Sequence, residues 1–228
     1  FGFLVIYSDT DSVVIVLREM TKEDVFLFLK EVNSNLPSLM EVELENFYRR
    51  GIFVMKKGEE KGAKKKYALL SEKGDIKVVG FEAIRRDWSY LAKEVQKKVL
   101  EFVLREGSIE LALEYIQQII QEVSEEKIPK EKMIIRTQLK KKISSYDLVG
   151  PHVVVAKRMK ELGNDVGPGS VIRYIVTKGK GLIREKAKIP EEAGDYDPEY
   201  YIKNQILPAV EKIFSVTGYD IREPGSKE

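Results

Sequence analysis

The sequence predicts an α+β protein, with an antiparallel β-sheet and one or two helices first and a mainly helical part after them. Three observations lead to this prediction. Two runs of apolar, mostly β-branched residues flank a short polar turn within residues 3–16, which is typical of a β-hairpin. Short apolar segments separated by Gly-containing turns continue to about residue 82. From about Asp87 the apolar residues recur every three or four positions, the period of an α-helix.

The β-rich part is expected to contain one clear helix. Thr21 precedes a polar turn with two acidic residues, a favourable helix start, and Pro37 ends the helix after about Asn35. The apolar face of this helix is expected to carry Val25, Phe26, Leu29 and Val32. The expected strands lie at residues 3–18 (the hairpin), 40–45, 51–57, 65–71 and 76–81.

Two segments between these strands have distinctive patterns. Met40–Glu45 alternates apolar and acidic residues, so we expect a half-buried strand with one acidic face. The connection over residues 58–63 is polar and contains two glycines, so we expect it to form a mobile tip.

The second part is divided by clear helix boundaries. Gly107 ends one helix and Ser108 caps the next, while Pro208 predicts a kink in the last. The expected elements are helices at residues 87–107, 108–126, 151–162 and 197–216, a strand at 171–176, and a short helical or extended piece at 137–142. The change of pattern near residues 82–88 predicts two domains, residues 1–82 and 83–228.

The composition excludes several classes of protein. The 228 residues suffice for one large or two small domains, and 43% hydrophobic residues suffice for a buried core. The absence of cysteine excludes disulfides and thiolate metal sites and favours an intracellular, cytoplasmic location. No apolar run is long enough to span a membrane, and no signal peptide is visible. The first residue is Phe rather than Met, so we expect a processed, trimmed or incompletely represented chain.

The charges are balanced in number but unevenly spread. The formal net charge is +2, and Lys and Glu are abundant, as in many thermophilic proteins. Six lysines lie between Lys56 and Lys66, against two glutamates. A nucleic-acid-binding protein of low net charge needs such a cluster, although a lysine run is more often the solvated face of a strand.

The polar turn of the hairpin carries two aspartates. Asp9 and Asp11 are two residues apart, so their side chains could point to the same side. Two neighbouring carboxylates repel each other, and a divalent cation relieves this repulsion. Mg²⁺ is usually held by one or two carboxylates together with substrate phosphates. The hairpin therefore indicates a magnesium site for phosphoryl or nucleotidyl transfer, unless the aspartates serve only as turn-forming residues.

Residues 7–12, Tyr-Ser-Asp-Thr-Asp-Ser, resemble the palm-domain signature of family B DNA polymerases, which is usually Tyr-Gly-Asp-Thr-Asp-Ser. Ser8 takes the place of the glycine, a residue preferred where the backbone needs a positive φ or a close approach. Five further segments resemble palm and thumb segments of archaeal replicative members, in the same order: residues 64–68, 80–89, 150–158, 168–176 and 200–210. The resemblance covers nearly the whole chain and implies a partial palm at residues 1–82 and a thumb at residues 83–228.

The resemblance implies a role for the residues of the turn. Asp11 corresponds to the aspartate that binds both catalytic metals, and Asp9 to its neighbour, which shapes the site. The residues that would border the nucleotide site are Tyr7, Thr10 and Ser12. The implied cofactor is Mg²⁺ in a two-metal mechanism, with a primer 3′-OH as the attacking group and pyrophosphate as the leaving group.

Other residues are implied to contact DNA. Lys65 corresponds to a lysine that reaches the minor groove of the new duplex, with Lys64 beside it, and Tyr67 to a residue near the primer. Because the minor-groove acceptors are nearly the same for every base pair, such a lysine can test the shape of a pair without reading sequence. Arg85 and Arg86 would contact the duplex backbone, which carries no sequence information.

Several of these residues also have simpler interpretations. Glu43 and Glu45, on the expected acidic strand, could have a secondary metal role or only a structural one. The adjacent arginines at 85 and 86 could form a surface network with Glu82 and Asp87. Packing roles are favoured for four other conspicuous residues, Trp88, His152, Tyr200 and Tyr201.

Two parts of the family pattern are missing from this sequence. Neither the earlier palm motif with another metal-binding aspartate nor the fingers helix that binds the triphosphate is found. We therefore expect the small, C-terminal subunit of a split polymerase, located at the nucleoid. A larger partner chain would supply the exonuclease domain, the fingers and the other palm motif, and would dock on the uncovered edge of the hairpin. The other expected partners are primer-template DNA, deoxynucleoside triphosphates and, through the larger chain, a sliding clamp.

Three alternatives stay open at this point. The chain could be a proteolytic or engineered fragment of a single-chain polymerase. It could be a non-catalytic DNA-binding accessory module. Ser8 and the lone carboxylate pair favour this alternative, and four intact residues disfavour it, namely Asp9, Asp11, Lys65 and Tyr67. It could also be a different nucleotidyl transferase built on a palm-like hairpin, which the extent of the resemblance disfavours.

Overall fold

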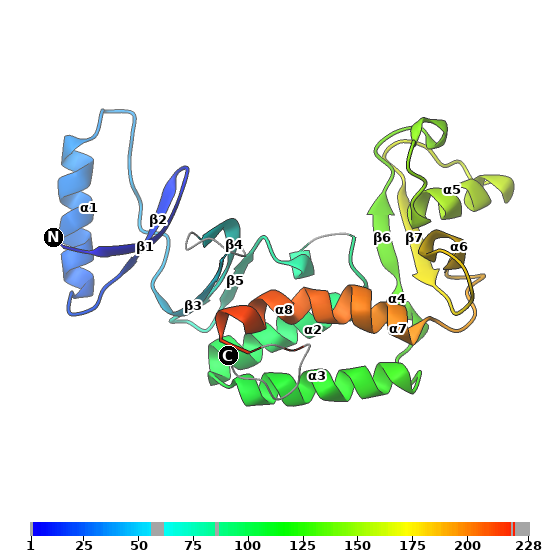
Figure 1. The fold of residues 1–228 in the computed structure, drawn as a ribbon. Coiled ribbons are helices and arrows are strands. Elements are labelled where there is room, and N and C mark those ends of the chain that lie inside the picture. The colour runs from blue at the N-terminus through cyan, green and yellow to red at the C-terminus, as the bar shows by residue number, and fades with distance from the viewer. Residues whose placement is uncertain (1, 56–61, 85–86, 220, 222–228) are drawn as a thin grey trace.

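The computed structural model describes residues 2–55, 62–84, 87–219 and 221 of the chain (Figure 1). Within them, three small antiparallel sheets and a layer of helices confirm the predicted α+β class. The N-terminal hairpin and its helix lie at one end, a three-stranded sheet follows, and long helices connect it to a second three-stranded sheet (Figure 1). Among the described helices, none has both the length and the apolar character that crossing a bilayer requires.

The predicted hairpin is confirmed. Strand β1 (Leu4–Asp9) pairs with β2 (Ser12–Val16), and only two residues connect them. Helix α1 (Lys22–Asn35) begins at Thr21, as expected from the sequence. The Thr21 hydroxyl accepts a hydrogen bond from the Asp24 backbone N–H, and the Asp24 carboxylate accepts one from the Thr21 N–H, so both groups of this capping box are satisfied.

The expected apolar face of α1 is partly buried: Leu29 and Val32 are half-buried, and only Phe26 is exposed. Val25 is the only buried residue of this helix, whereas Phe26 is 55% exposed, with its ring at an edge-to-face distance of 6.2 Å from that of Phe47. An apolar stripe becomes buried only if another element covers it. The contact with Phe47 covers Phe26 only in part.

The prediction of a strand at Met40–Glu45 is wrong, because this segment has no strand partner. The Asn33 side chain takes the place of one: its amide donates to the Val42 carbonyl over 2.9 Å, and its oxygen accepts from the Val42 N–H over 2.8 Å. One asparagine therefore satisfies the backbone of the residue that a neighbouring strand would otherwise bind.

The central sheet is formed by β3 (Tyr48–Met55), β4 (Gly62–Ser71) and β5 (Ile76–Val79), in that order. It leads through a short 3-10 turn (Glu82–Ile84) to helix α2 (Tyr90–Glu101). A buried hydrophobic core runs without a break from Ile52 on β3 to Ile175 on the second sheet. The central sheet therefore shares its core with the helices that follow it.

The helical layer follows the predicted boundaries. Helix α2 continues as a π-helical turn (Phe102–Glu106) and ends at Gly107, whose φ of +71° favours glycine. The Ser108 side chain then caps α3 (Ile109–Ser124) by accepting from the Leu111 N–H. The last helix is divided into α7 (Pro198–Tyr201), a π-helical turn (Ile202–Ile206) and α8 (Leu207–Val216). The π turn lies just before Pro208, which has no N–H to donate to the preceding turn.

The second sheet consists of β6 (Ile135–Gln138), β7 (Val171–Val176) and β8 (Ala187–Lys188). It stands at the end of the helical layer away from the central sheet (Figure 1). The strand at residues 171–176 is confirmed, and the piece expected at 137–142 is extended where it belongs to β6. The short helices around this sheet are α4 (Lys130–Met133), a 3-10 turn (Ile143–Ser145), α5 (Pro151–Glu161) and α6 (Ile183–Lys186).

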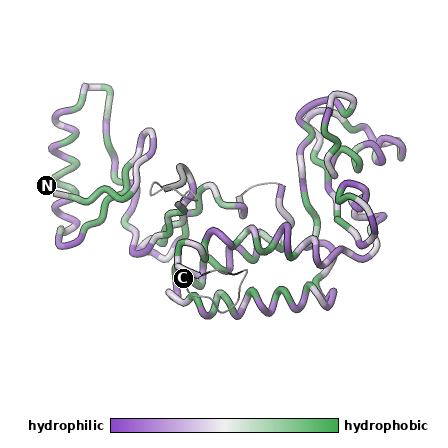
Figure 2. The backbone as a smooth tube through the Cα atoms, viewed as in Figure 1, coloured by the Kyte–Doolittle hydropathy of each residue, from purple (hydrophilic) through white to green (hydrophobic). Residues whose placement is uncertain are grey.

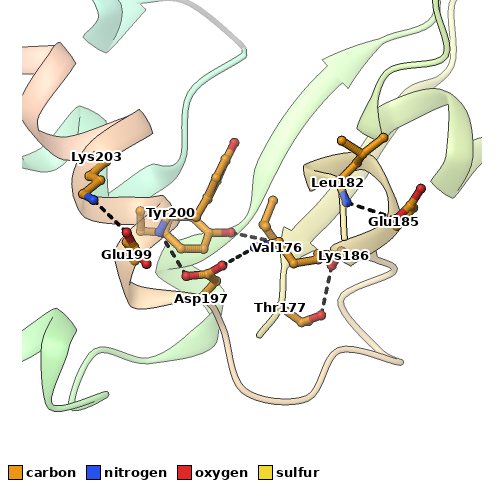
Figure 3. Close-up of polar contacts among 10 residues, drawn as sticks. Val176, Thr177, Leu182, Glu185, Lys186, Asp197, Glu199, Tyr200 and Lys203 are labelled. Carbon is orange, nitrogen blue, oxygen red and sulfur yellow. Dashed lines mark hydrogen bonds and ion pairs between the residues drawn. The ribbon is translucent and has the colours of Figure 1, made fainter. Parts of the chain in front are cut away.

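Polar contacts join this sheet to the helical layer. The Tyr201 hydroxyl accepts from the Val176 N–H over 3.1 Å and donates to the Met133 carbonyl over 2.7 Å. Lys186 forms an ion pair of 2.6 Å with Asp197, the residue that caps α7 (Figure 3). The N-terminus of α7 is thereby fixed to the end of β7 and to the start of β8.

Candidate active site

The two aspartates lie at the tip of the N-terminal hairpin. Asp9 is the last residue of β1, whereas Asp11 belongs to the two-residue turn, so strand alternation does not fix their relative orientation. One Asp9 carboxylate oxygen accepts hydrogen bonds from the Thr10 N–H over 2.9 Å and from the Thr10 hydroxyl over 3.3 Å. Thr10, Asp11 and Ser12 are exposed, so the tip is open to a substrate.

These residues suit a magnesium ion in part. Aspartate carboxylates are the hard oxygen ligands that Mg²⁺ prefers, and it usually takes only one or two of them. Within the described residues, no group of three or more Asp, Glu, His or Cys side chains could hold a metal. The donor set at the tip therefore fits half of a magnesium site, which substrate phosphates and further protein ligands would have to complete.

Three aromatic rings position the hairpin against the central sheet. The ring of Tyr7, two residues before Asp9, lies 5.4 Å from that of Phe53 on β3 and 5.1 Å from that of Tyr67 on β4. Phe53 and Tyr67 are themselves 5.7 Å apart. Aromatic rings at these centroid distances stabilise a structure by more than the burial of their apolar surface alone. The structure thus brings Tyr67 close to the strand that carries Asp9. Tyr67 is the residue that the family resemblance implies to lie near the primer.

The other expected DNA contacts lie at the limits of the described structure. Lys64 and Lys65 belong to strand β4, but their side chains are outside the described part. Arg85 and Arg86 lie outside the described residues altogether.

Lys66 corrects the prediction of a single basic run over residues 56–66. Its side chain is buried, and Nζ lies 2.6 Å from Oε1 of the equally buried Glu82. The Gln96 amide donates to the other Glu82 oxygen over 2.8 Å and to the Ala209 carbonyl, so β4, α2 and α8 meet at this network. A signal was present in the sequence: Lys66 alternates with two apolar residues, Ala68 and Leu70, which face the core.

The network affects the ionisation of Glu82. Burial by itself would raise the pKa of the Glu82 carboxyl, but hydrogen bonds from Lys66 and Gln96 outweigh it and hold that pKa below its ordinary value of 4.5. Glu82 is therefore bound in a buried network with Lys66 and Gln96, while the two arginines of the alternative surface network lie outside the described residues.

Glu43 and Glu45 do not lie on an acidic strand. Glu43 is exposed, while Glu45 forms an ion pair with Lys77 and accepts a hydrogen bond of 2.8 Å from the Tyr48 hydroxyl. The bonds from Lys77 and Tyr48 lower the pKa of Glu45, and burial together with Glu45 raises the pKa of Tyr48 to about 12. These contacts favour the structural role for Glu45, and the secondary metal role stays a prediction.

Packing roles are supported for Tyr200, Tyr201 and His152. Tyr201 is fully buried, and the His152 ring lies at an edge-to-face distance of 5.6 Å from that of Tyr146. Burial lowers the pKa of His152, so a neutral imidazole is favoured there. Trp88 is half-buried beside Ser89, the residue that caps α2.

Comparison with protein families supplies the context of this hairpin. The model of DNA polymerase family B matches residues 1–217, nearly the whole chain. The chain belongs to this family. A "DNA polymerase" of Thermococcus kodakarensis is 43% identical over 96% of this chain, and one of Methanocaldococcus jannaschii is 44% identical over 98%. A solved family B DNA polymerase from Pyrobaculum calidifontis superimposes with a TM-score of 0.71 and 31% identity over 96% of this chain.

Each of these family B polymerases is much longer than this chain. The chain spans 13% of the Thermococcus kodakarensis sequence, 14% of the Methanocaldococcus jannaschii sequence and 27% of the Pyrobaculum calidifontis structure. A "DNA polymerase" of a Thermococcus strain, 42% identical, is matched over all of this chain and 30% of its own length. The likeness thus concerns one section of these polymerases.

Proposed function

We propose that this chain supplies part of the active site and the thumb of a template-directed DNA polymerase. Residues 1–82 would form the C-terminal portion of the palm, and residues 83–228 would form the thumb that holds the duplex. The observation that carries this proposal is the pair Asp9 and Asp11 at an open hairpin tip, fixed by Tyr7 next to the strand that carries Tyr67.

The chemistry would depend on the carboxylates of the tip. Asp11 would hold Mg²⁺ directly, and Asp9, already bonded to Thr10, would keep the turn in shape and add negative charge. When bound there, Mg²⁺ supplies a lower pKa for the primer 3′-OH and stabilises the negative charge that develops on the leaving pyrophosphate. Tyr7, Thr10 and Ser12 would border the incoming deoxynucleotide.

The primer and the duplex would lie along β4 and the start of α2. Lys65 would reach the minor groove, with Lys64 beside it and Tyr67 near the primer. Arg85 and Arg86, directly before α2, would contact phosphates and so hold the duplex without reading its sequence. These roles rest on the likeness of the residues to the family motifs.

We also propose that a larger partner chain completes the palm. Within the described residues of the first 47 positions, Val25 alone is a buried hydrophobic residue. Figure 2 shows hydrophobic stretches along the strands of the hairpin. The large apolar side chains that are exposed in this part are Leu4, Val5, Ile6, Val13, Phe26, Leu27, Leu39, Met40 and Val42. Contiguous exposed apolar surface is typical of an interface.

We infer that this partner is the rest of a family B polymerase. The relatives are more than three times as long as the section that this chain matches, so a second chain could supply the remaining parts. That chain would bring the exonuclease domain, the fingers, the other palm aspartate and any contact with a sliding clamp. The alternative is that the same parts precede this section in one longer polypeptide. The enzyme would act at the nucleoid, inside the cell.

The decisive variant is Asp11→Ala in the assembly of this chain with its larger partner. We expect Mg²⁺-dependent primer extension to be lost while assembly, followed by gel filtration, is kept. Asp75→Ala is the matched control, because Asp75 is an equally exposed aspartate at the turn between β4 and β5. Unchanged extension by the Asp11 variant would refute the catalytic assignment.

A second candidate function is a non-catalytic DNA-binding module derived from a polymerase. The observation in its favour is that the described residues hold no group of three or more potential metal ligands. The two functions differ in what co-purifies with the chain from native cells. A companion chain with the missing aspartate supports catalysis, whereas a complete polymerase supports the accessory role.

A further inference from the structure

Two arginines face each other across strands β6 and β7. In the antiparallel register, Arg136 of β6 is directly opposite Arg173 of β7. Both side chains are exposed, while the neighbouring Ile135 and Ile172 are fully buried, so the two arginines share the solvent-facing side of the sheet. Like charges at directly opposed positions destabilise a sheet. The pair therefore needs a compensating anion or has a role that offsets its cost.

The protein neutralises this pair only in part. Arg173 forms an ion pair of 3.0 Å with Glu191, both at the surface. The described part of the chain gives Arg136 no carboxylate partner; its guanidinium lies 4.9 Å from the centroid of the Tyr90 ring instead. An aromatic ring fixes a guanidinium in place without removing its charge. Arg136 is thus held in a defined position with its hydrogen-bond donors free for an anion.

Two further charged residues, Asp87 and Lys93, lie at the start of α2. Lys93 is one helical turn after Tyr90 on α2, so both residues lie on the same side of the helix. Burial lowers the pKa of Lys93, and the positive charge of Arg136 lowers it further, while Asp87 opposes both effects.

We propose that Arg136 and Arg173 form a binding site for a backbone phosphate of duplex DNA. An anion placed between them would relieve their mutual repulsion, and guanidinium groups suit phosphate because they donate two parallel hydrogen bonds. This site rests on the proposed function, because it assumes that the thumb holds a duplex. The DNA contacts expected from Arg85 and Arg86 lie just before α2. The proposed phosphate site would add a further contact on strands β6 and β7, near the N-terminal end of the same helix.

The position in the fold agrees with this assignment. The β6–β7 sheet and the central sheet stand on the same side of the helical layer, at opposite ends of it (Figure 1). A duplex that reaches from the central sheet toward the thumb would pass the start of α2, where Tyr90 and Arg136 meet. Phosphate contacts there would fix the direction of the duplex and carry no sequence information.

Salt dependence of duplex binding tests the proposal directly. The probe is a fluorescently labelled DNA duplex, and the protein is the full chain without partner or metal. Each phosphate contact contributes about 0.9 to the slope of log affinity against log salt. We expect Arg136→Gln and Arg173→Gln each to reduce the slope by about that amount, which corresponds to about eight-fold weaker binding at 0.1 M salt if affinities converge at 1 M.

The matched control is Arg105→Gln. Arg105 is also exposed and without an ion pair in the described structure, but it follows the opposite end of α2. We expect it to leave the slope unchanged, and thermal unfolding checks that all three variants fold. Wild-type slopes in both test variants would overturn the proposal, as would failure of the folded wild-type chain to bind duplex DNA at low salt.

The result can be separated from a failure of the catalytic assignment. Because duplex binding is measured without metal, Asp11→Ala should bind the duplex as the wild type does. A reduced slope in the arginine variants together with an active Asp11→Ala assembly would keep the phosphate site and reject the catalytic role. Unchanged slopes in the arginine variants together with an inactive Asp11→Ala assembly would reject the phosphate site and keep the catalytic role.

Discussion

Lys66 Nζ lies 2.6 Å from Glu82 Oε1, and both side chains are almost completely buried. Gln96 binds the second oxygen of the same carboxylate and also the Ala209 carbonyl. Lys66 of the central sheet is therefore tied, through Glu82 and Gln96, to helices α2 and α8. Since Lys66 is next to Lys65 and Tyr67 in the chain, this network fixes the strand that is expected to contact the primer.

The first prediction is that Lys66→Met strongly destabilises the chain. It would leave the Glu82 carboxylate buried without its counter-charge, which costs about 3–5 kcal/mol of unfolding free energy. Lys98→Met is the control, because the Lys98–Glu101 pair is at the surface and such pairs contribute about 0–1 kcal/mol. Urea denaturation measures both, and equal effects of the two substitutions would contradict the importance of the buried pair.

The second prediction concerns acid stability. The folded-state pKa of Glu82 is lowered below 4.5, so its contribution to stability is fully present above about pH 4.5. That contribution is lost as the pH falls through the lowered pKa, where the folded protein must take up a proton. Glu82→Gln should therefore flatten the fall in unfolding free energy below pH 4.5, as measured by denaturation at several pH values. A slope identical to that of the wild type would show that other carboxylates control acid unfolding.

The third prediction is that Tyr7 fixes the hairpin. Tyr7→Ala removes two ring contacts, each worth about 0.5–1.5 kcal/mol beyond burial. We expect faster amide hydrogen exchange in β1 and β2. Exchange in α2 and α3 should change little, because the hydrophobic core that holds these helices contains no residue of the hairpin. Tyr7→Phe keeps the ring contacts and should protect β1 and β2 better than Tyr7→Ala does. Unchanged exchange in the alanine variant would mean that other contacts hold the hairpin.

The fourth prediction is that Ser8→Gly does not improve the hairpin. Ser8 lies inside β1 opposite Val13, and it is not among the described residues with a positive φ. Glycine has no conformational advantage at such a position and loses more entropy on folding, so we expect a loss of about 0.5–1 kcal/mol. Thermal unfolding would show it. A clear gain in stability would mean that Ser8 is strained.

Local interactions explain what could be predicted from the sequence. The hairpin, the capping of α1 by Thr21, the end of a helix at Gly107 and the strand Val171–Val176 depend on residues a few positions apart. The aspartates of the turn and the family to which they point are also readable without the fold. Apolar spacing, capping side chains and turn residues act over short distances in the chain, so the sequence carries them directly.

Burial and pairing were decided only by the tertiary structure. Lys66 is expected at the surface and is buried, because Glu82, sixteen residues later, meets it in the core. Phe26 is expected inside and is exposed, because its contact with Phe47 covers only part of the side chain. Arg136 and Arg173 are brought together by a strand register that joins positions 37 residues apart. What surrounds a side chain depends on segments distant in the chain, and local periodicity holds no information about them.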